Sequence, residues 1–354
     1  MRETSPALLI SHTATRARRY RLALLGLAGL VPLAALVASG IGAYRISPWE
    51  IPAALAEGGR DAQVLWSIRF PRVALALLVG AAFGVAGAAL QGLFRNPLAD
   101  PGLLGVTAGA AAGAALWIVL VGAWLPSLRG QLGTWGLPVA AFVGSALCVS
   151  LVWRVAKQDG KLAVVTLLLA GIALNALVGA VVGLLTVVAD DEQLRTLTFW
   201  LLGGLGHATW STVLACGSPM LLGMLLVLRQ SRALNAFALG ESDAYHLGVR
   251  VEVVKRWLVL GVALCVGSAV AASGGIGFIG LVVPHMLRLA VGADHRFLLP
   301  AAALGGALLL VVADLMARTA AAPAELPVGV ITALVGGPFF LCLLLKAKRE
   351  VLHA

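Results

Sequence analysis

The sequence predicts an all-α integral membrane protein with about ten membrane-spanning helices, and three observations lead to this fold class. Hydrophobic residues make up 60% of the 354 residues and charged residues only 12%, whereas a soluble protein carries charge on about a quarter of its residues. Apolar stretches of about 18 residues or more recur along the chain, each long enough to cross about 30 Å of hydrocarbon. At about 20 residues per span, we expect a single transmembrane domain over residues 1–354.

The positions of the polar loops place the spans in chain order. We expect helices near residues 22–43, 68–92, 102–124, 135–155, 162–188, 199–229, 254–274, 276–292, 298–319 and 327–346. Four arginines precede the first helix, as in a signal peptide, but its apolar part is long enough to span the membrane. We therefore expect an uncleaved first helix.

Glycine and proline predict the irregular points of these helices. Pro71 fits the first turn of the second helix, where its missing N–H costs nothing. Gly203, Gly204 and Gly206 predict a broken or re-entrant start of the sixth helix, and Gly336-Gly337-Pro338 predicts a loosened centre in the tenth. Small residues four apart suit close helix crossings, and such pairs occur at Gly80–Gly84, Gly109–Gly113 and Gly179–Gly183.

The basic residues predict the orientation. With the N-terminus inside, 19 of the 26 Lys and Arg residues fall in the inner segments, which are 1–21, 92–100, 154–161, 229–256, 288–296 and 346–349. Positive charge favours the cytoplasmic side. We therefore expect both termini, the N-terminal segment 1–21 and the long loop 229–256 to be cytoplasmic.

Several kinds of chemistry are missing from the sequence. The only Gly-Lys pair, Gly160-Lys161, is followed by Leu162, so there is no P-loop for ATP. Hydrolase and metalloprotease motifs do not occur, and the four cysteines are widely spaced in apolar runs. The net charge of +10 is spread over short loops rather than gathered on one face for nucleic acid. We predict no catalytic, cofactor-binding or metal-binding residue.

The loop 229–256 is the only inner loop with predicted structure of its own. Residues 233–239 and 242–247 fit two short helices that are separated by Gly240 and ended by Gly248. Such a pair offers a docking surface, and the alternative is a solvated connector. Ionisable groups are scarce in the spans, Asp314 and His285 being the clearest, which disfavours ion coupling. We therefore expect a separate ATP-hydrolysing partner that acts on residues 233–248.

Three arginines contradict the charge rule because they lie at outer helix ends. Arg69 and Arg72 are i,i+3 neighbours and share one helix face, and Arg318 ends the ninth span. An outer cationic patch would bind an acidic partner. The alternative is snorkelling toward lipid phosphates, and Asp314 would neutralise Arg318 within its own helix.

A polar turn follows the second helix at the inner side. Asn96, Pro97, Leu98 and Asp100, closed by Pro101, predict a rigid turn. It would serve as a cytoplasmic gate or ATPase contact, or only as a capped connector between helices. The sequence leaves both open.

These residues resemble the FecCD-type permeases of binding-protein-dependent ABC importers, which carry vitamin B12, ferric siderophores or haem. The resemblance covers nearly the whole chain. It rests on RFPR at 69–72, Gln91, RNPLADP at 95–101, LGV at 104–106, LGE at 239–241, LGV at 247–249, GFIGLVVPH at 277–285, GADHR at 292–296 and ELPVG at 325–329.

The resemblance implies a type II importer permease of the bacterial inner membrane, assembled as a homodimer above two ATP-binding cassette subunits that use the ATP. It implies that a periplasmic substrate-binding protein docks through glutamates on Arg69, Arg72 and Arg318. It also implies ATPase coupling through Leu234, Asn235, Leu239, Gly240, Glu241, Ala244, Leu247 and Gly248.

The cargo is predicted from two shorter segments. DDEQLR at 190–195 with Trp200, and APAE at 322–325, are similar to haem permeases. A ferric siderophore or cobalamin remains the alternative within the family. Outside it, the alternatives are an ion-coupled secondary transporter and, with least support, an intramembrane enzyme.

Overall fold

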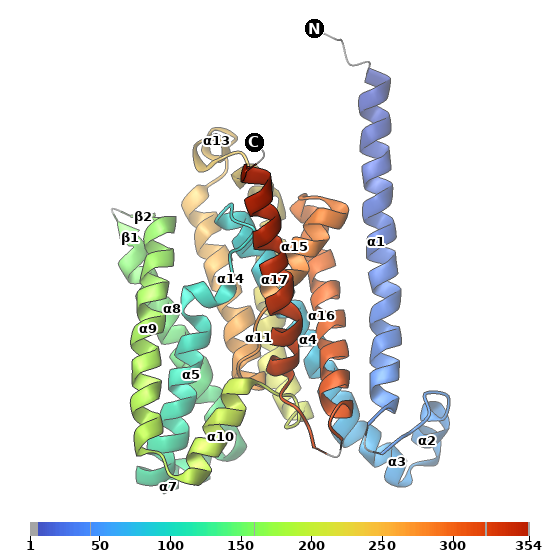
Figure 1. Ribbon diagram of the computed structural model, residues 1–354, viewed down its shortest axis with the longest axis vertical. Coiled ribbons are helices and arrows are strands. Elements are labelled where there is room, and N and C mark those ends of the chain that lie inside the picture. Colours follow the sequence, from blue (N-terminus) through green and yellow to red (C-terminus); the bar gives the residue numbers. More distant parts are fainter. Residues whose placement is uncertain (1–5, 43, 159, 323, 353–354) are drawn as a thin grey trace.

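A computed structural model describes residues 6–42, 44–158, 160–322 and 324–352 of the chain (Figure 1). These residues form helices and one short antiparallel hairpin. The long helices are α1 (Pro6–Gly40), α4 (Phe70–Leu93), α5 (Val106–Leu116), α8 (Gly136–Ala156), α9 (Val164–Val188), α10 (Asp191–Leu202), α11 (Trp210–Leu228), α14 (Val251–Ser273), α15 (Ile279–Val291), α16 (His295–Thr319) and α17 (Val328–Leu352).

Shorter elements connect them. The short α-helices are α2 (Ile51–Glu57), α3 (Gly59–Val64), α6 (Gly122–Trp124), α7 (Pro126–Leu132), α12 (Ser231–Phe237) and α13 (Glu241–His246). The hairpin pairs β1 (Lys157–Gln158) with β2 (Lys161–Leu162). Single π or 3₁₀ turns lie at η1 (Leu65–Arg69), η2 (Pro101–Leu104), η3 (Trp117–Val121) and η4 (Gly133–Trp135).

The predicted all-α membrane fold is confirmed. Within the described residues, seven helices are long and apolar enough to cross a membrane, and three shorter apolar helices accompany them at Val106–Val121, Ile279–Val291 and Val328–Cys342. Each of these ten segments overlaps one predicted span. The start of α1 and the end of α17 lie at the same end of the molecule as α13 and the hairpin, opposite α2, α3 and α7 (Figure 1).

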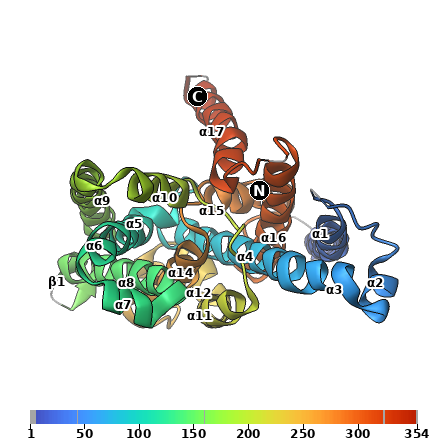
Figure 2. The ribbon, with the colours of Figure 1, turned by 90° about the horizontal axis from the view of Figure 1, so that it is seen from below.

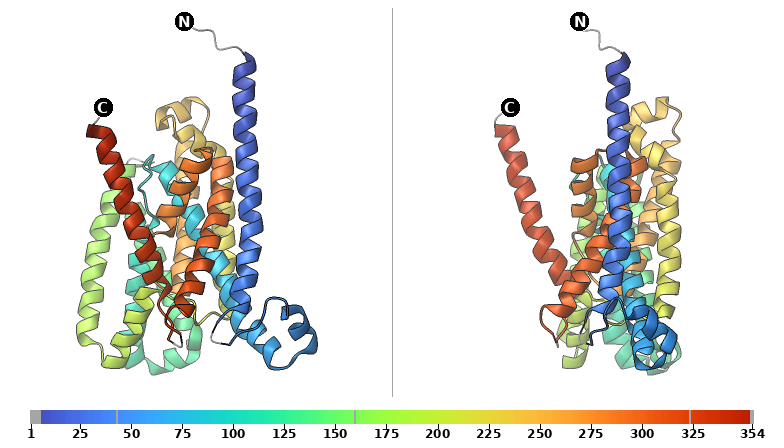
Figure 3. Two further views of the ribbon diagram at one scale, coloured as in Figure 1. Left: turned by 45° about the vertical axis from the view of Figure 1, so that its right-hand side comes forward. Right: turned by 90° about the vertical axis from the view of Figure 1, so that its right-hand side faces the viewer.

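Helix α4 forms the centre of the bundle (Figure 2). Most of its residues are buried, and it packs against α16, α14, α11 and α15. Helices α5 and α8 form a second tightly packed pair. Helix α17 packs beside α15 and α16 near its start and then leans away from the bundle (Figure 3). The core is thus built around α4, with one face of α17 unpaired in the described chain.

The predicted helix 199–229 is two helices. Asp190 accepts a hydrogen bond from Gln193 N (2.8 Å) and its own N–H donates to Gln193 Oε1 (3.2 Å), which forms a capping box for the separate helix α10. Gly203 ends α10 with a φ of +72°. Gly204 N then donates to the carbonyl group of Ser273 (2.8 Å), the last residue of α14. The glycine-rich break was predicted, whereas the independent helix before it was missed.

Two other details differ from the sequence predictions. Helix α17 continues past Gly336 and Pro338 without a break, so the loosening predicted there does not interrupt the helix. Gly336 instead leaves room for the ring of Phe278, which a β-carbon there would overlap. The second span starts before residue 68, because α3 continues through the π turn η1 into α4. The missing N–H of Pro71 is accommodated just after that turn.

The small-residue pairs divide into two groups. A β-carbon at Gly80 or Gly84 would collide with the α16 backbone at Gly306 or Ala302, so α4 and α16 meet backbone to backbone. Gly109 and Gly113 face α8 in the same way, at Gly144 and Ala140. By contrast, Gly179 and Gly183 on α9 face open space in the described chain, so this predicted crossing is not made within one copy.

Candidate coupling and docking sites

The loop between α11 and α14 folds as two short helices. Helices α12 and α13 each lie within about two residues of the predicted positions. Gly240 (φ +130°) and Gly248 (φ +84°) have backbone angles that favour glycine; Gly240 is the N-cap of α13, and Gly248 follows its C-cap Leu247.

One side of this helix pair holds it to the bundle and the other is open. Leu234 and Ala244 are fully buried, whereas Leu239, Tyr245 and Leu247 are exposed. Three large apolar side chains on one small loop form an apolar surface suited to a protein partner. We call Leu239, Tyr245 and Leu247 the loop surface.

Asn235 fixes α12 to the start of α16. Its Nδ2 donates to Asp294 Oδ1 (2.7 Å), and its Oδ1 accepts from His295 N (2.8 Å). Asp294 caps α16 by accepting from Arg296 N (3.0 Å). The bond from the Arg296 side chain and the one from Asn235 lower the pKa of Asp294 to about 2, so this carboxylate is ionised at neutral pH.

Two side-chain-to-backbone hydrogen bonds hold the inner turn. Asn96 Oδ1 accepts from Leu98 N (2.9 Å), and Asp100 Oδ1 accepts from Gly102 N (2.7 Å), capping η2. Burial raises the pKa of Asp100, although the Gly102 N–H bond opposes this. Pro97, between these bonds, restricts the backbone. These contacts fit a capped connector, and they leave the gate function a prediction.

The inner turn also lies next to the α12–α13 loop. Arg95, which starts the turn, has a φ of +49°, and its Nη1 lies 3.8 Å from where a β-carbon of Gly240 would be. The guanidinium group of Arg95 therefore lies beside the connection between α12 and α13.

A cavity of about 570 Å³ lies between α4, α5, α9 and the segment that precedes α15. Asp100, Thr107 and Asn175 supply polar groups to its otherwise apolar wall. Asn175 Nδ2 donates to Gly102 O (3.1 Å), while its Oδ1 is buried without a partner among the described residues.

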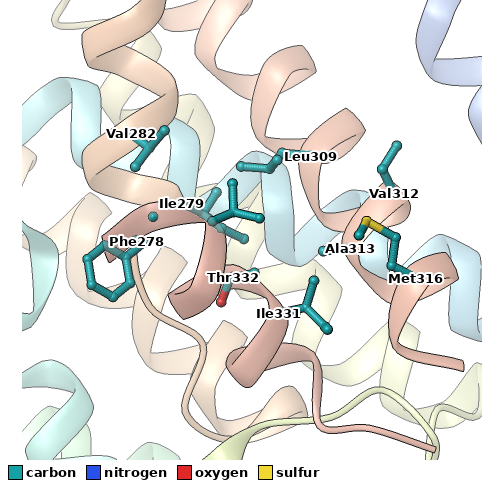
Figure 4. Close-up of a pocket in the computed structure, with 11 residues that line it drawn as sticks. Phe278, Ile279, Val282, Leu309, Val312, Ala313, Met316, Ile331 and Thr332 are labelled. Carbon is teal, nitrogen blue, oxygen red and sulfur yellow. The ribbon is translucent and has the colours of Figure 1, made fainter. Parts of the chain in front are cut away.

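A second cavity, of about 40 Å³, lies where α17 meets α15 and α16 (Figure 4). Thr332 supplies its only hydroxyl, and the other lining side chains are apolar. Phe278 lines both cavities and has a left-handed φ of +67°. Phe278 therefore lies between the large cavity and the part of α17 around Gly336.

The three outer arginines are not an open cationic patch, so that expectation is wrong. Arg69, Arg72 and Arg318 are each only 6% exposed. Arg69 donates to the carbonyl groups of Ser39 (3.3 Å), Ile41 (2.5 Å) and Tyr44, which lie in the last turn of α1 and in the segment that follows it. Since a buried guanidinium needs partners for its donors, these carbonyls explain how Arg69 is accommodated.

Arg72 and Arg318 belong to one ionic network. Arg72 Nε and Nη2 bond to Asp314 (both 3.0 Å to Oδ1), and its Nη1 lies 2.9 Å from both oxygens of Glu325. Arg318 Nε lies 3.6 Å from Asp314 Oδ2, and its Nη2 donates to Ala38 O. The predicted pairing of Asp314 with Arg318 is present, but Asp314 is shared with Arg72. The partners of both guanidinium groups in the described chain are protein groups.

Sequence reasoning missed two residues of these sites. The sequence places Glu325 in a family motif but does not indicate that it pairs with Arg72. It places Lys255 among the charges of the loop 229–256, whereas Lys255 lies in α14 and is 2% exposed. Its position was visible in principle, because Lys255 continues the apolar spacing of Leu258, Val259 and Val262.

Comparisons with known proteins agree with this architecture. The profile of the FecCD transport family matches residues 30–346. The hemin transport system permease protein HmuU of Yersinia pestis is 52% identical over 288 residues, which cover 81% of this chain and 84% of HmuU. The vitamin B12 import system permease protein BtuC of Escherichia coli O9:H4 (strain HS) is 42% identical over 330 residues, 92% of this chain and 95% of BtuC.

A solved structure agrees as well. A transporter assigned to the metal-chelate type of ABC transporters, in an inward-facing conformation, superimposes with a TM-score of 0.79 at 35% identity and covers 91% of this chain and 98% of that one. The family profile spans nearly all ten apolar helices. The chain therefore belongs to the FecCD transport family and is a multi-pass permease of the bacterial inner membrane.

Proposed function

We propose that this chain is the transmembrane permease subunit of an ATP-driven importer that passes haem from a periplasmic binding protein into the cytoplasm. One observation carries the choice of cargo, namely the 52% identity with a hemin permease against 42% with a vitamin B12 permease. A ferric siderophore or cobalamin is the second candidate, since the large cavity has no side chain specific for haem iron among its lining residues.

The proposal includes one permease domain over residues 1–354 and a defined set of partners. Two ATP-binding cassette subunits dock on the cytoplasmic loop surface, and Leu234, Asn235, Gly240, Glu241, Ala244 and Gly248 hold that surface in place. A second copy of the chain packs against the exposed apolar face of α9, where Gly179 and Gly183 are open. The inner turn acts as the gate. The chain itself hydrolyses no ATP.

An ion-coupled carrier is the less favoured mechanism. Asp314, the clearest carboxylate within the apolar spans, is bonded to Arg72 and lies near Arg318. A carboxylate neutralised in this way is poorly placed to carry protons through the membrane.

Uptake in proteoliposomes tests the function. With its ATPase and a haem-binding protein, we expect the permease to import haem only in the presence of ATP, and neither a ferric siderophore nor cobalamin with its own binding protein. The purified chain alone should show no ATPase activity. Haem uptake driven by a proton or sodium gradient without nucleotide would contradict the proposal, and preferential uptake of another chelate would contradict the cargo.

For the binding protein, we propose docking at the end that carries Arg69, Arg72 and Arg318, through exchange of carboxylates on Arg72. Glu325 is 52% exposed, whereas its companion Asp314 is 2% exposed. A glutamate of the binding protein would replace Glu325 on Nη1 while Asp314 stays bonded. Arg69 and Arg318 keep the outer ends of α1, α4 and α16 together around this position.

Glu325→Gln tests this exchange. Because the variant removes a competitor for Arg72, we expect the binding protein to bind about twofold to fivefold more tightly, as for a surface ion pair of up to about 1 kcal/mol. Affinity is measured by biolayer interferometry on permease in nanodiscs. Glu192→Gln, an exposed residue of α10, is the control for the change in net charge. Equal or weaker binding by Glu325→Gln would show that the carboxylates do not compete.

A further inference from the structure

A buried ion cluster attaches α13 to the transmembrane bundle. Lys255 lies in the second turn of α14 with its side chain 2% exposed. Its ammonium group donates to Glu241 Oε2 at the start of α13 (2.7 Å), to Glu252 Oε1 (3.3 Å) and to Leu162 O in β2 (3.0 Å). An ammonium has three donors, so every one is used and each partner comes from a different element.

The same cluster holds the hairpin between α8 and α9. Glu252 Oε2 accepts from Leu162 N (2.8 Å) while Lys255 bonds to the carbonyl group of the same residue. Both backbone polar groups of Leu162 are therefore fixed by side chains of α14. Helix α9 begins at Val164, two residues later, and α13 and the hairpin lie at the same end of the bundle (Figure 1).

Helix α12 has a different attachment. Asn235 bonds to Asp294 and His295 at the start of α16, as described above. Between the end of α12 and the start of α13 the chain has only Ala238, Leu239 and Gly240, and Gly240 has a φ of +130°. The two short helices are therefore held to different groups of long helices, with a short connection between them.

We propose that Lys255 is a positioning residue of the import cycle, which makes α14 and the α8–α9 hairpin move with α13. The inference rests on the proposed function, because it supposes that an ATPase displaces α13. Through Leu162 the displacement reaches α9, whose Asn175 lines the large cavity and bonds to Gly102 next to the inner turn. The Asn235 contacts transmit the motion of α12 to α16.

The cluster is suited to this purpose because its charges cannot separate cheaply. A buried ammonium that loses a carboxylate is left undersatisfied, at a cost well above that of an exposed ion pair. Glu241, in contrast, is 45% exposed and can be neutralised without opening the core. Glu241→Gln is therefore the variant of choice, and Lys255→Met removes the other end of the same bond.

The experiment measures cargo imported per ATP hydrolysed, in proteoliposomes that contain the complete transporter and its binding protein. For Glu241→Gln we expect this ratio to fall about fivefold or more, because an amide replaces the carboxylate in one charged hydrogen bond. Glu241→Gln combined with Lys255→Met should be no worse than Lys255→Met alone, since Lys255→Met already removes the bond to Glu241. Asp243→Asn, an exposed carboxylate of the same helix, is the matched control.

Hydrogen exchange on the permease alone separates this inference from the proposed function. We expect faster amide exchange around Leu162 in Glu241→Gln and Lys255→Met, and wild-type exchange in Asp243→Asn. If exchange responds as expected but wild-type protein shows no ATP-driven import, the proposed function fails and the attachment stands.

Unchanged exchange, a parallel loss of transport and ATP hydrolysis, or additive effects in the double variant would overturn the inference. If Lys255→Met does not assemble, Glu241→Gln decides alone.

Discussion

Replacing Asp314 by asparagine is expected to destabilise the permease by about 3–5 kcal/mol, the usual cost of removing one partner from a buried ion pair. Asp314 bonds to Nε and Nη2 of Arg72 and lies near Nε of Arg318. Glu325 cannot take its place, because it contacts Arg72 only through Nη1. Unfolding of the purified permease by sodium dodecyl sulfate in mixed micelles measures the loss.

Glu325→Gln is the control for this experiment. Its carboxylate contacts the same guanidinium but is half-exposed, so we expect a loss below about 1 kcal/mol. If Asp314→Asn were as stable as wild type, the ionic network would not hold the outer ends of α4 and α16 together. Arg72 and Arg318 would then have to be regarded as free for a partner.

Replacing Gly84 by valine is expected to prevent α4 and α16 from packing. A β-carbon at this position would overlap Ala302 O of α16, and the obstacle is backbone, which cannot rotate away. Overpacking against side chains costs about 1–3 kcal/mol, and we expect a larger loss here. The measurement is the yield of monodisperse permease after detergent extraction, together with its melting temperature.

Gly26→Val on α1 is the matched control, since a β-carbon there would meet nothing within 4 Å in the described chain. It is expected to leave the yield and the melting temperature unchanged, because surface substitutions usually change the free energy of unfolding by no more than about 0.5 kcal/mol. Equal effects of the two substitutions would mean that the α4–α16 contact adjusts easily, contrary to its backbone-to-backbone geometry.

The sequence predicts the ten spans because length and hydropathy are local properties of each helix. The two short helices of the loop surface were predicted for a similar reason, since Gly240 and Gly248 delimit them. The smaller elements were harder. Helix α10 has a capping box at Asp190 and Gln193 that could have been recognised, whereas the β1–β2 hairpin has only two residues in each strand.

The environment of the charged residues could not be predicted in the same way. Arg72 is separated by 242 residues from Asp314 and by 253 from Glu325, so their contact exists only after α4, α16 and the loop before α17 have packed. The burial of Lys255 likewise depends on Glu241 and on Leu162, which is 93 residues away. Charge counting located these side chains near the ends of the spans but did not show that they are internally paired.

The close contact of α4 with α16 also determines where the protein can bend. No layer of side chains separates Gly84 from the backbone of Ala302. Sliding of one helix along the other would bring side chains into this contact, so we expect α4 and α16 to move as one rigid unit. Any change of shape during turnover must be absorbed at hinges elsewhere. The two adjoining breaks between helices, residues 203–209 and 274–278, are joined by backbone hydrogen bonds from Gly204 N to Ser273 O and from Gly275 N to Trp200 O, so any hinge there would move both segments together.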